Sequence, residues 1–548
     1  MDKVGFILLV LWFLLPACTP EAKTGNRDEK PEEQSSATVR GTVLDNEGNR
    51  LEGVVVSDCY KCTVTGKDGE FELESDLSVA KFVFVSIPSG YSVPVKKGLP
   101  IFFKRLSEEK QADGKYRLEF ILNRMTRNPE RYSMLVVADP QPRARDQAGD
   151  RHAYHSLDVC EDLYRDMREK GAEIQRDRPC YGVFLGDIVH GDMDLFDTFI
   201  SNGTSKMGFP NFCVLGNHDV YLKATSDEEG RGVFEEKLCP VNSSFNIGKV
   251  HHIVVDNIIL TVGDRGILGG GGSAYGLTDD IWQWLKEDLS YVDKSCAVMI
   301  YSHQPMFMSE SGNDCYPKAR HGQHYASALS KFAEVHAWAG HIHHMFNYTY
   351  DSDSAMGNIN VHTVVRSTGD FPTNEYIDNG TPRGYVVVDV DGDDISWRFR
   401  PLPYQTALHV KTPPEYKMRA WDYDEDGVAR MKEDGRRLDE FYQMNVYPPG
   451  IYDDGCVYAN VFMWDQKWGM PEYVSSDGTR TTMELVTDDG HSYDAGYKEL
   501  FDYYYPSRDW SSDTCRRIFR ARTDKKSDVG RVEVTDRFGN VYSTNVSW

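Results

Sequence analysis

Two short stretches of this 548-residue chain, Tyr301-Ser-His-Gln-Pro305 and Ala339-Gly-His-Ile-His343, decide how the rest is interpreted. Each begins at the end of an apolar run and places histidine just beyond it. If the chain stays extended past Ala339, His341 and His343 lie on the same side, because side chains alternate along an extended chain. The two stretches therefore predict imidazoles that converge on one point in space.

Three stretches upstream also end apolar runs in polar residues: Val136-Val-Ala-Asp-Pro-Gln141, Phe184-Leu-Gly-Asp187 and Val214-Leu-Gly-Asn-His-Asp219. In open α/β sheets, ligands bind just past the carboxyl ends of the strands. We therefore expect all five stretches to meet at one edge.

The candidate ligands are carboxylates, amides and imidazoles, with no cysteine among them: Asp139, Gln141, Asp187, Asn217, His303, His341 and His343. Such a mixed set suits Mn, Fe, Zn or Mg rather than a thiolate structural zinc site. Seven ligands are too many for one tetrahedral ion and suit two. One carboxylate can bridge two ions roughly 3.5–4 Å apart, as in two-metal hydrolytic sites.

The ordered set Asp139-x-Gln141, Gly186-Asp187, Gly216-Asn-His-Asp219, His303 and Gly340-His-x-His343 resembles the calcineurin-like metallophosphoesterases. The resemblance covers roughly residues 133 to 400. It implies a first ion held by Asp139, Gln141, Asp187 and His343. It implies a second ion held by Asp187, Asn217, His303 and His341, with Asp187 bridging.

The same resemblance implies roles for His218 and Asp219, which would not bind metal. His218 would stabilise the transition state and protonate the leaving oxygen, and Asp219 would orient its ring. The nucleophile would be a hydroxide that bridges the two ions, in line with the leaving group.

Gln141 departs from the family pattern, which usually has histidine at this position. A glutamine oxygen is neutral and harder than imidazole. We therefore expect a weaker first site that favours Mn²⁺ or Mg²⁺ over Zn²⁺.

Composition narrows the class of protein. A chain of 548 residues is too long for one ordinary core, so two to four domains are expected. The formal net charge of −24 argues against a nucleic-acid partner, which needs a basic face. The resemblance implies a small phosphorylated substrate as the partner, and the sequence is silent on oligomeric state.

Residues 1–18 have the features of an export signal. Val4 to Ala17 is an apolar run of fourteen residues after Lys3, shorter than the roughly 20 residues that span a bilayer. Leu15-Pro-Ala-Cys18 resembles a bacterial lipobox, so Cys18 would become the lipidated first residue and anchor the protein to a membrane. The alternative is plain cleavage near Ala17. Either way we expect an exported protein, and with lipidation a bacterial envelope lipoprotein on the periplasmic or surface face of the outer membrane.

Two all-β regions are expected to flank the catalytic region. Residues 19–37 are polar and predict a disordered tether. Residues 38–125 alternate like a small β-sandwich, and their spacing from Gly41 to Phe71 resembles carboxypeptidase regulatory-like modules. Residues 401–548 have short alternating runs and a closing hairpin at Arg537-Phe-Gly-Asn-Val541, which predict a second β domain.

Residues 126–400 alternate between apolar strands and amphipathic helices, which predicts an α/β layered domain. With the resemblance, the expected fold class is a four-layer metallophosphoesterase β-sandwich with flanking helices. Thr278 is the expected N-cap of a helix that runs through Leu289.

Several further residues have two interpretations. His321 and His324, in the loop between two ligand histidines, either face substrate or are structural, and Arg383 either meets an anion or is a turn residue. Gly269 to Gly272 form either a flap over the site or a plain loop. Cys59-x-x-Cys62 is either a local disulfide or a pair of free thiols, rather than a zinc site.

The sequence thus predicts an exported two-metal hydrolase of phosphate mono- or diesters. One alternative is a binding protein on a decayed phosphatase fold, which only Gln141 supports and His218 opposes. The other keeps the metals and cleaves a nucleotide or sugar-nucleotide pyrophosphate.

Overall fold

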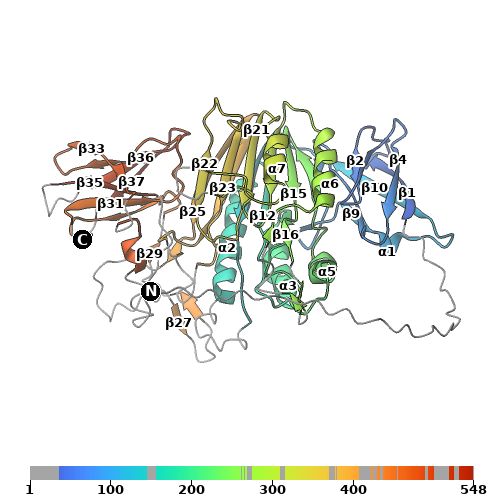
Figure 1. Cartoon of the computed structure of the whole chain (residues 1–548), viewed down its shortest axis with the longest axis horizontal. Coiled ribbons are helices and arrows are strands. Elements are labelled where there is room, and N and C mark those ends of the chain that lie inside the picture. Colours follow the sequence, from blue (N-terminus) through green and yellow to red (C-terminus); the bar gives the residue numbers. More distant parts are fainter. Residues whose placement is uncertain are drawn as a thin grey trace, which may run out of the picture.

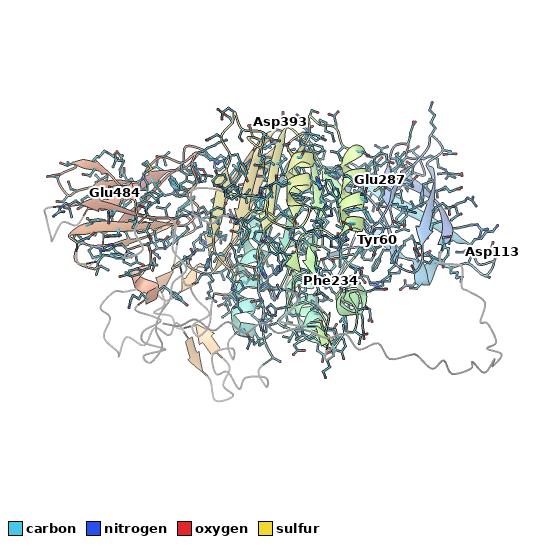
Figure 2. The ribbon with its side chains drawn as sticks, viewed as in Figure 1. Tyr60, Asp113, Phe234, Glu287, Asp393 and Glu484 are labelled. Carbon is cyan, nitrogen blue, oxygen red and sulfur yellow. The ribbon has the colours of Figure 1, made fainter. Side chains whose placement is uncertain are left out.

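A computed structural model shows two all-β regions at opposite ends of a central α/β region (Figure 1). It describes residues 36–144, 156–260, 262–263, 266–267, 274–308, 315–369, 377, 379–405, 421–423, 429–431, 436–437, 439–452, 454–487, 491–498, 517–523 and 530–546. Asp113 and Glu484 lie in the two end regions, far from each other along the long axis (Figure 2). None of the helices in these residues is both long and apolar enough to cross a membrane.

The N-terminal region is built around two four-stranded sheets, with the two-stranded sheet β7 (Val95–Lys96)–β8 (Leu99–Pro100) and the short helix α1 (Leu106–Glu109) beside them. The first has the order β4 (Glu70–Asp76), β1 (Ser36–Asp45), β10 (Tyr116–Arg124), β6 (Tyr91–Ser92). The second has the order β3 (Cys62–Val64), β2 (Val55–Ser57), β5 (Phe82–Val85), β9 (Phe103–Arg105). Alternate residues of β4 are buried, which is the pattern of a strand with one face on a core. β1 begins two residues before the start that the sequence predicted.

The central region has two mixed sheets. The first has the order β13 (Asn211–Cys213), β12 (Cys180–Phe184), β11 (Arg131–Val137), β24 (Gly384–Asp391), β25 (Asp394–Pro401). The second has the order β14 (Ser243–Ile247), β15 (Val250–Val254), β20 (Ala297–Tyr301), β21 (Glu334–Ala339), β23 (Ile359–Thr363), β22 (Phe346–Thr349). Strands β11 to β13 run parallel, and so do β15, β20, β21 and β23.

The residues of β11 divide between two cores. Met134 and Val136 belong to the cluster that includes the second sheet, whereas Leu135 and Val137 pack with α2 (Ser156–Ile174). The first sheet is therefore covered on both faces, by the second sheet and by helices. This layering confirms the predicted metallophosphoesterase fold class with all-β ends.

Further helices flank the sheets: α3 (Leu195–Thr198), α4 (Ser205–Met207), α5 (Asp227–Lys237), α6 (Asp279–Ser290) and α7 (Gly322–Leu329). Thr278 caps α6 as predicted, because its side chain accepts the backbone N–H of Ile281.

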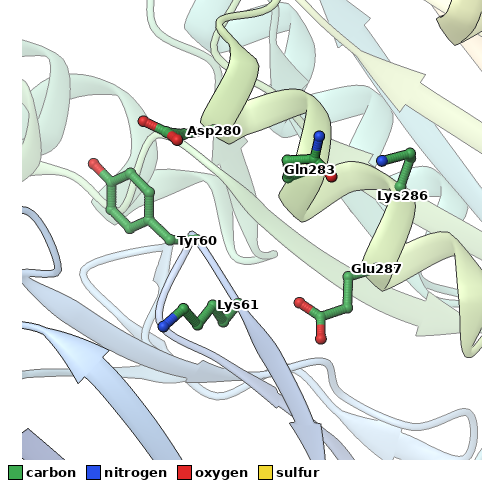
Figure 3. A pocket seen from close by; sticks show the side chains of 6 residues that line it. All are labelled: Tyr60, Lys61, Asp280, Gln283, Lys286 and Glu287. Carbon is green, nitrogen blue, oxygen red and sulfur yellow. The ribbon is translucent and has the colours of Figure 1, made fainter.

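Helix α6 joins the central region to the N-terminal region. The Trp284 indole donates to Ser57 Oγ at 3.0 Å, and Glu287 accepts the backbone N–H of Cys62 at 2.9 Å. Beside these contacts, an open pocket of about 500 Å³ separates α6 from the loop before β3 (Figure 3). Its lining is of mixed charge: Tyr60, Lys61, Asp280, Gln283, Lys286 and Glu287. Cys59 and Cys62, at the base of this loop, are buried free thiols.

The C-terminal region also has two four-stranded sheets. Their orders are β30 (Met444–Tyr447), β31 (Cys456–Val461), β35 (Ile518–Arg522), β34 (Glu484–Leu485), and β33 (Arg480–Thr482), β32 (Glu472–Val474), β36 (Arg531–Thr535), β37 (Val541–Asn545). Strands β36 and β37 form the predicted closing hairpin. Buried Asp494 accepts from Asn445, Tyr447 and Asn460, and Asn445 and Asn460 also donate to the carbonyls of residues 380 and 379 of the central region.

Candidate metal centre

Five loops that follow strands converge on one point. Asp139 follows β11, Asp187 follows β12 and Asn217 follows β13, all from the first sheet. His303 follows β20 and His341 follows β21, both from the second sheet. Because these strands are parallel within each sheet, their carboxyl ends carry the five loops to the same edge, as the sequence predicted.

The backbone of these loops is unusual. Eight described residues other than glycine have a positive φ, and five of them are predicted ligands: Asp139, Gln141, Asp187, His341 and His343. Left-handed backbone at a non-glycine residue costs on the order of 1–3 kcal/mol and clusters at functional sites. The expectation of an extended chain past Ala339 is therefore wrong: His341 and His343 have φ of 66° and 61°. A tight turn forms instead, because the N–H of Ile342 donates to the carbonyl of Gly340 at 2.8 Å.

Because of this turn, His341 and His343 lie in two different groups of ligand residues. Asp187, His303 and His341 form one group whose ligand atoms lie within 4.8 Å of one another, and Asp139, Asp187 and His343 form a second. Asp187 belongs to both groups. His303 Nε2 lies 3.3 Å from Asp187 Oδ1, and His343 Nε2 lies 3.8 Å from Asp139 Oδ1.

The two amides complete these groups. Asn217 Oδ1 lies 2.9 Å from His303 Nε2 and 2.9 Å from His341 Nδ1, so its oxygen faces the first group. The Gln141 side-chain nitrogen donates to Asp187 Oδ2. If the amide of Gln141 rotates by half a turn, its oxygen takes the position of its nitrogen beside Asp187. An oxygen at that position could bind a cation. All seven predicted ligands therefore lie together.

Glycine precedes several ligands because the loops touch. A Cβ at Gly216 would lie 2.0 Å from the backbone nitrogen of Asp187, and a Cβ at Gly340 would lie 2.4 Å from Asp139 Oδ2. Both distances are far inside contact distance. The glycines of the Gly-Asn-His and Gly-His-x-His motifs thus allow the ligand loops to pack side by side.

The electrostatics favour a bound cation. Asp139, Asp187 and His303 are at most 1% exposed, and within the described residues Asp139 and Asp187 form ion pairs with histidines alone. Burial raises the pKa of Asp139 to about 6. Burial lowers the pKa of His303, but Asp187 and Asp139 outweigh it and raise that pKa to about 9. Two buried carboxylates without a permanent positive partner, ringed by imidazoles and amide oxygens, fit divalent ions.

Three family models match the chain. They are the N terminal of calcineurin-like phosphoesterase at residues 37–124, calcineurin-like phosphoesterase at 133–345, and the C terminal of calcineurin-like phosphoesterase at 366–542. The chain belongs to the calcineurin-like phosphoesterases. It is accordingly a metal-dependent phosphoric ester hydrolase.

Three solved structures are similar to parts of this calcineurin-like phosphoesterase. A purple acid phosphatase from yellow lupin (Lupinus luteus) seeds is 12% identical, with a TM-score of 0.36 and 67% of each chain covered. A 5′-nucleotidase from Candida albicans is 14% identical with a TM-score of 0.29, and covers 51% of this chain. The NAD nucleotidase of Haemophilus influenzae is 11% identical with a TM-score of 0.27, and covers 55%. The chain spans 53% of each nucleotidase, and a comparison with curated proteins finds no match.

His218 lies beside the ligand groups, where its backbone N–H donates to Asp187 Oδ1 at 2.8 Å. Burial lowers the pKa of its imidazole. The prediction that Asp219 orients this ring is wrong. The two oxygens of Asp219 instead accept the backbone N–H groups of Val189 and Gly216, both at 2.9 Å. Asp219 therefore fastens together the loops that carry Asp187 and Asn217.

Arg366 is a residue of the site that the sequence analysis missed. It is 4% exposed, its backbone N–H donates to the carbonyl of His343, and its guanidinium lies 3.5 Å from the carbonyl of Gln141. It follows the apolar run Val364-Val365 in the same manner as the predicted ligands follow theirs. The search for polar residues that directly follow apolar runs could have located Arg366 if it had included cationic residues.

The three residues that the sequence suggested for substrate contact have neighbours outside the ligand groups. His321 and His324 stack on Trp282 of α6, and His321 Nε2 lies 2.7 Å from Asp279 Oδ1. Arg383 is fully buried, with a nitrogen 3.4 Å from Asp162 of α2. Contact of these three residues with substrate stays a prediction. Cys18, the signal segment and Gly269 to Gly272 lie outside the described residues.

Proposed function

We propose that this calcineurin-like phosphoesterase is an exported enzyme that hydrolyses a mono- or diester of a small phosphorylated molecule with two divalent ions. The observation that carries the proposal is the pair of ligand groups with Asp187 in common. A carboxylate common to two groups is what a two-ion centre requires, since one side chain must face both ions.

Asp139, Gln141, Asp187 and His343 would hold one ion, and Asp187, Asn217, His303 and His341 the other. Bound ions would supply positive charge for the phosphoryl oxygens and would lower the pKa of water. The oxygen of Gln141 suits a hard ion, which favours Mn²⁺ or Mg²⁺ at its site.

The remaining residues of the site act on the ester itself. The backbone N–H of His218 donates to Asp187, which places this residue beside the ligand groups, and its imidazole would carry a proton to the leaving oxygen as the general acid. Arg366 adds a permanent positive charge next to the ligand loops, which favours an anionic substrate. Asp219 keeps the loops of Asp187 and Asn217 in register.

Metal analysis and a substrate panel test the proposal. The full chain is purified, its Mn, Fe, Zn and Mg contents are measured, and its activity is assayed on 4-nitrophenyl phosphate, bis(4-nitrophenyl) phosphate and a nucleoside diphosphate sugar. We expect about two ions per chain and turnover of one of the two simple esters. A chain that binds no divalent ion, or that cleaves only the pyrophosphate bond, would contradict the proposal.

The general acid is tested by His218→Ala. On ethyl phosphate, whose leaving alkoxide needs a proton, we expect this variant to retain its ions and to lose about 10²- to 10⁴-fold in kcat, the range for removal of a general acid. Full activity on ethyl phosphate would exclude the acid role and leave the two-ion centre intact. Loss of the ions together with the activity would show that His218 supports the centre instead.

Export with a lipid anchor at Cys18 is the second part of the proposal, and it rests on the sequence of residues 1–18. The test follows incorporation of labelled fatty acid into the full-length chain and into its Cys18→Ser variant, with fractionation of the cells. We expect label in the parent chain alone, in the envelope fraction. Label in neither chain with release of a soluble product supports simple signal cleavage.

A further inference from the structure

The ring of His218 has one aromatic neighbour in the described residues, and it is His190. The two imidazoles are stacked, with centroids 4.2 Å apart and planes 17° from parallel. Their loops are also joined through the backbone, because the N–H of Gly191 donates to the carbonyl of His218 at 2.8 Å. The sequence analysis gave His190 no role, since it lies three residues past Asp187 and outside the motif.

Arg143 fixes the other side of His190. Its Nη2 lies 2.7 Å from His190 Nε2, and its backbone N–H donates to Ser156 Oγ at 2.9 Å, at the start of α2. A guanidinium can only donate, so His190 Nε2 must accept. The proton of the His190 ring therefore resides on Nδ1, and the ring is neutral.

A neutral His190 ring can stack on His218 whether or not His218 carries the proton of a general acid. When His218 carries the proton that it delivers, its imidazolium is positively charged. A second charged imidazole at 4.2 Å would oppose that charge, whereas a neutral ring packs against it without like-charge repulsion. Arg143 thus holds the His190 ring in place against the ring of His218.

We infer that His190 is a positioning residue for the reaction: it holds the His218 ring in the plane from which the proton reaches the leaving oxygen, and Arg143 holds His190. Within the described residues no hydrogen bond joins Asp219 to the His218 ring, and the oxygens of Asp219 accept the backbone N–H groups of Val189 and Gly216 instead. The inference rests on the proposed acid role of His218. It assigns the orientation of that acid to an Arg143–His190 pair from two loops of the first sheet.

Leaving-group dependence distinguishes positioning of an acid from general support of the fold. 4-Nitrophenolate departs without a proton, but an alkoxide does not. The full chain, loaded with manganese, is assayed on 4-nitrophenyl phosphate and on ethyl phosphate. For His190→Ala we expect kcat on ethyl phosphate to fall about 10- to 100-fold and kcat on 4-nitrophenyl phosphate to fall less than about threefold.

Three further variants complete the test. Arg143→Gln should show the same selectivity with a smaller loss, because it releases His190 without removing the ring. His190→Phe keeps a flat ring and should lose less on ethyl phosphate than His190→Ala. Tyr221→Ala, an exposed residue two positions past Asp219, should leave both substrates unchanged. Metal content and Tm are measured for every variant.

Equal loss on both substrates, or loss of metal, in His190→Ala would overturn the inference in favour of a structural role. Unchanged kinetics in both His190→Ala and Arg143→Gln would overturn it as well. His218→Ala separates this result from the proposed function. If His218→Ala is selective for ethyl phosphate and His190→Ala is not, the inference alone fails. If His218→Ala is not selective, the proposed acid role fails first.

Discussion

Among the described residues, two of the clusters that bring carboxylates and imidazoles together differ in how they are built. The cluster around Asp187 draws ligands from five loops of two sheets, and the Asp187 side chain is 1% exposed. The cluster around Asp279 joins the start of α6 to His321, and the Asp279 side chain is 73% exposed. In the exposed cluster Arg320 supplies the countercharge, 2.9 Å from the carboxylate.

The difference identifies which cluster requires a cation. An exposed carboxylate is solvated by water and contributes little when it pairs with arginine. Buried carboxylates are costly unless a positive partner neutralises them. In the described residues Asp139 and Asp187 form ion pairs with histidines alone, so a divalent ion is the group that fits. Residue type alone would not separate the two clusters, whereas burial and convergence do.

The largest effect is expected from a matched pair of substitutions, Asp187→Asn and Asp279→Asn. Asp187→Asn removes the charge common to both ligand groups and should lower kcat/KM on the order of 10³-fold or more, with loss of bound metal. Asp279→Asn should stay within about twofold of the parent. Elemental analysis and steady-state kinetics measure both. A large loss in Asp279→Asn would instead place the His321 cluster in contact with substrate.

A methyl group at the loop contact should give the next largest effect. In Gly340→Ala the new Cβ would lie 2.4 Å from Asp139 Oδ2, so the loops must separate by about an ångström. A displacement of that size costs about 10²-fold in rate, and metal affinity should fall with it.

The control for Gly340→Ala is Gly232→Ala in α5, where a Cβ would meet nothing within 4 Å. This change should leave kinetics and metal content as they were and raise Tm slightly, because alanine favours helix. Equal behaviour of the two variants would mean that the ligand loops do not depend on close contact.

The sequence predicted which side chains converge, because the signal is local. Each of these residues lies just past an apolar run, and the parallel strands carry the ends of those runs to one edge. It did not predict the turn at Gly340 to His343, since a positive φ at histidine depends on contacts from other loops. The role of Asp219 was missed for the same reason: its partners, Val189 and Gly216, are set by tertiary contacts.

The fold shows the same division. The cap at Thr278 and the β36–β37 hairpin are local features, and both are confirmed. That β24 lies beside β11, about 250 residues away along the chain, was not evident from any local pattern. Likewise, Arg143, His190 and His218 come from three separate loops, and only the structure brings them together.

Gln141→His should change which ion the buried cluster prefers. An imidazole in place of the neutral oxygen restores the common family ligand and favours zinc, so the ratio of zinc to manganese retained should rise about tenfold. Competition dialysis with both ions measures this ratio. Gln283→His, the same change at an exposed position of α6, serves as the control and should not alter it. An unchanged ratio in Gln141→His would exclude Gln141 from the ligands.

A third kind of histidine, buried without a carboxylate, should give the smallest effect. His252 lies in β15 between Phe245 and Tyr301, and its Nε2 lies 2.8 Å from the hydroxyl of Tyr132. Burial holds its pKa well below the usual value of 6.5. Below about pH 6.5 the unfolded chain therefore binds a proton that the folded chain does not. Stability that is present above pH 6.5 is lost as pH falls, by about 1.4 kcal/mol per pH unit for this group.

His252→Phe isolates this contribution from those of other buried groups. The variant should be less stable than the parent at pH 7.5, because the Tyr132 hydroxyl loses its partner. Between pH 7.5 and 5.5 it should lose about 1 kcal/mol less than the parent, as measured by urea unfolding at each pH. An equal loss in both proteins would show that the His252 ring takes up a proton within the core. Burial alone would then not separate the histidines that need a cation from those that stay neutral.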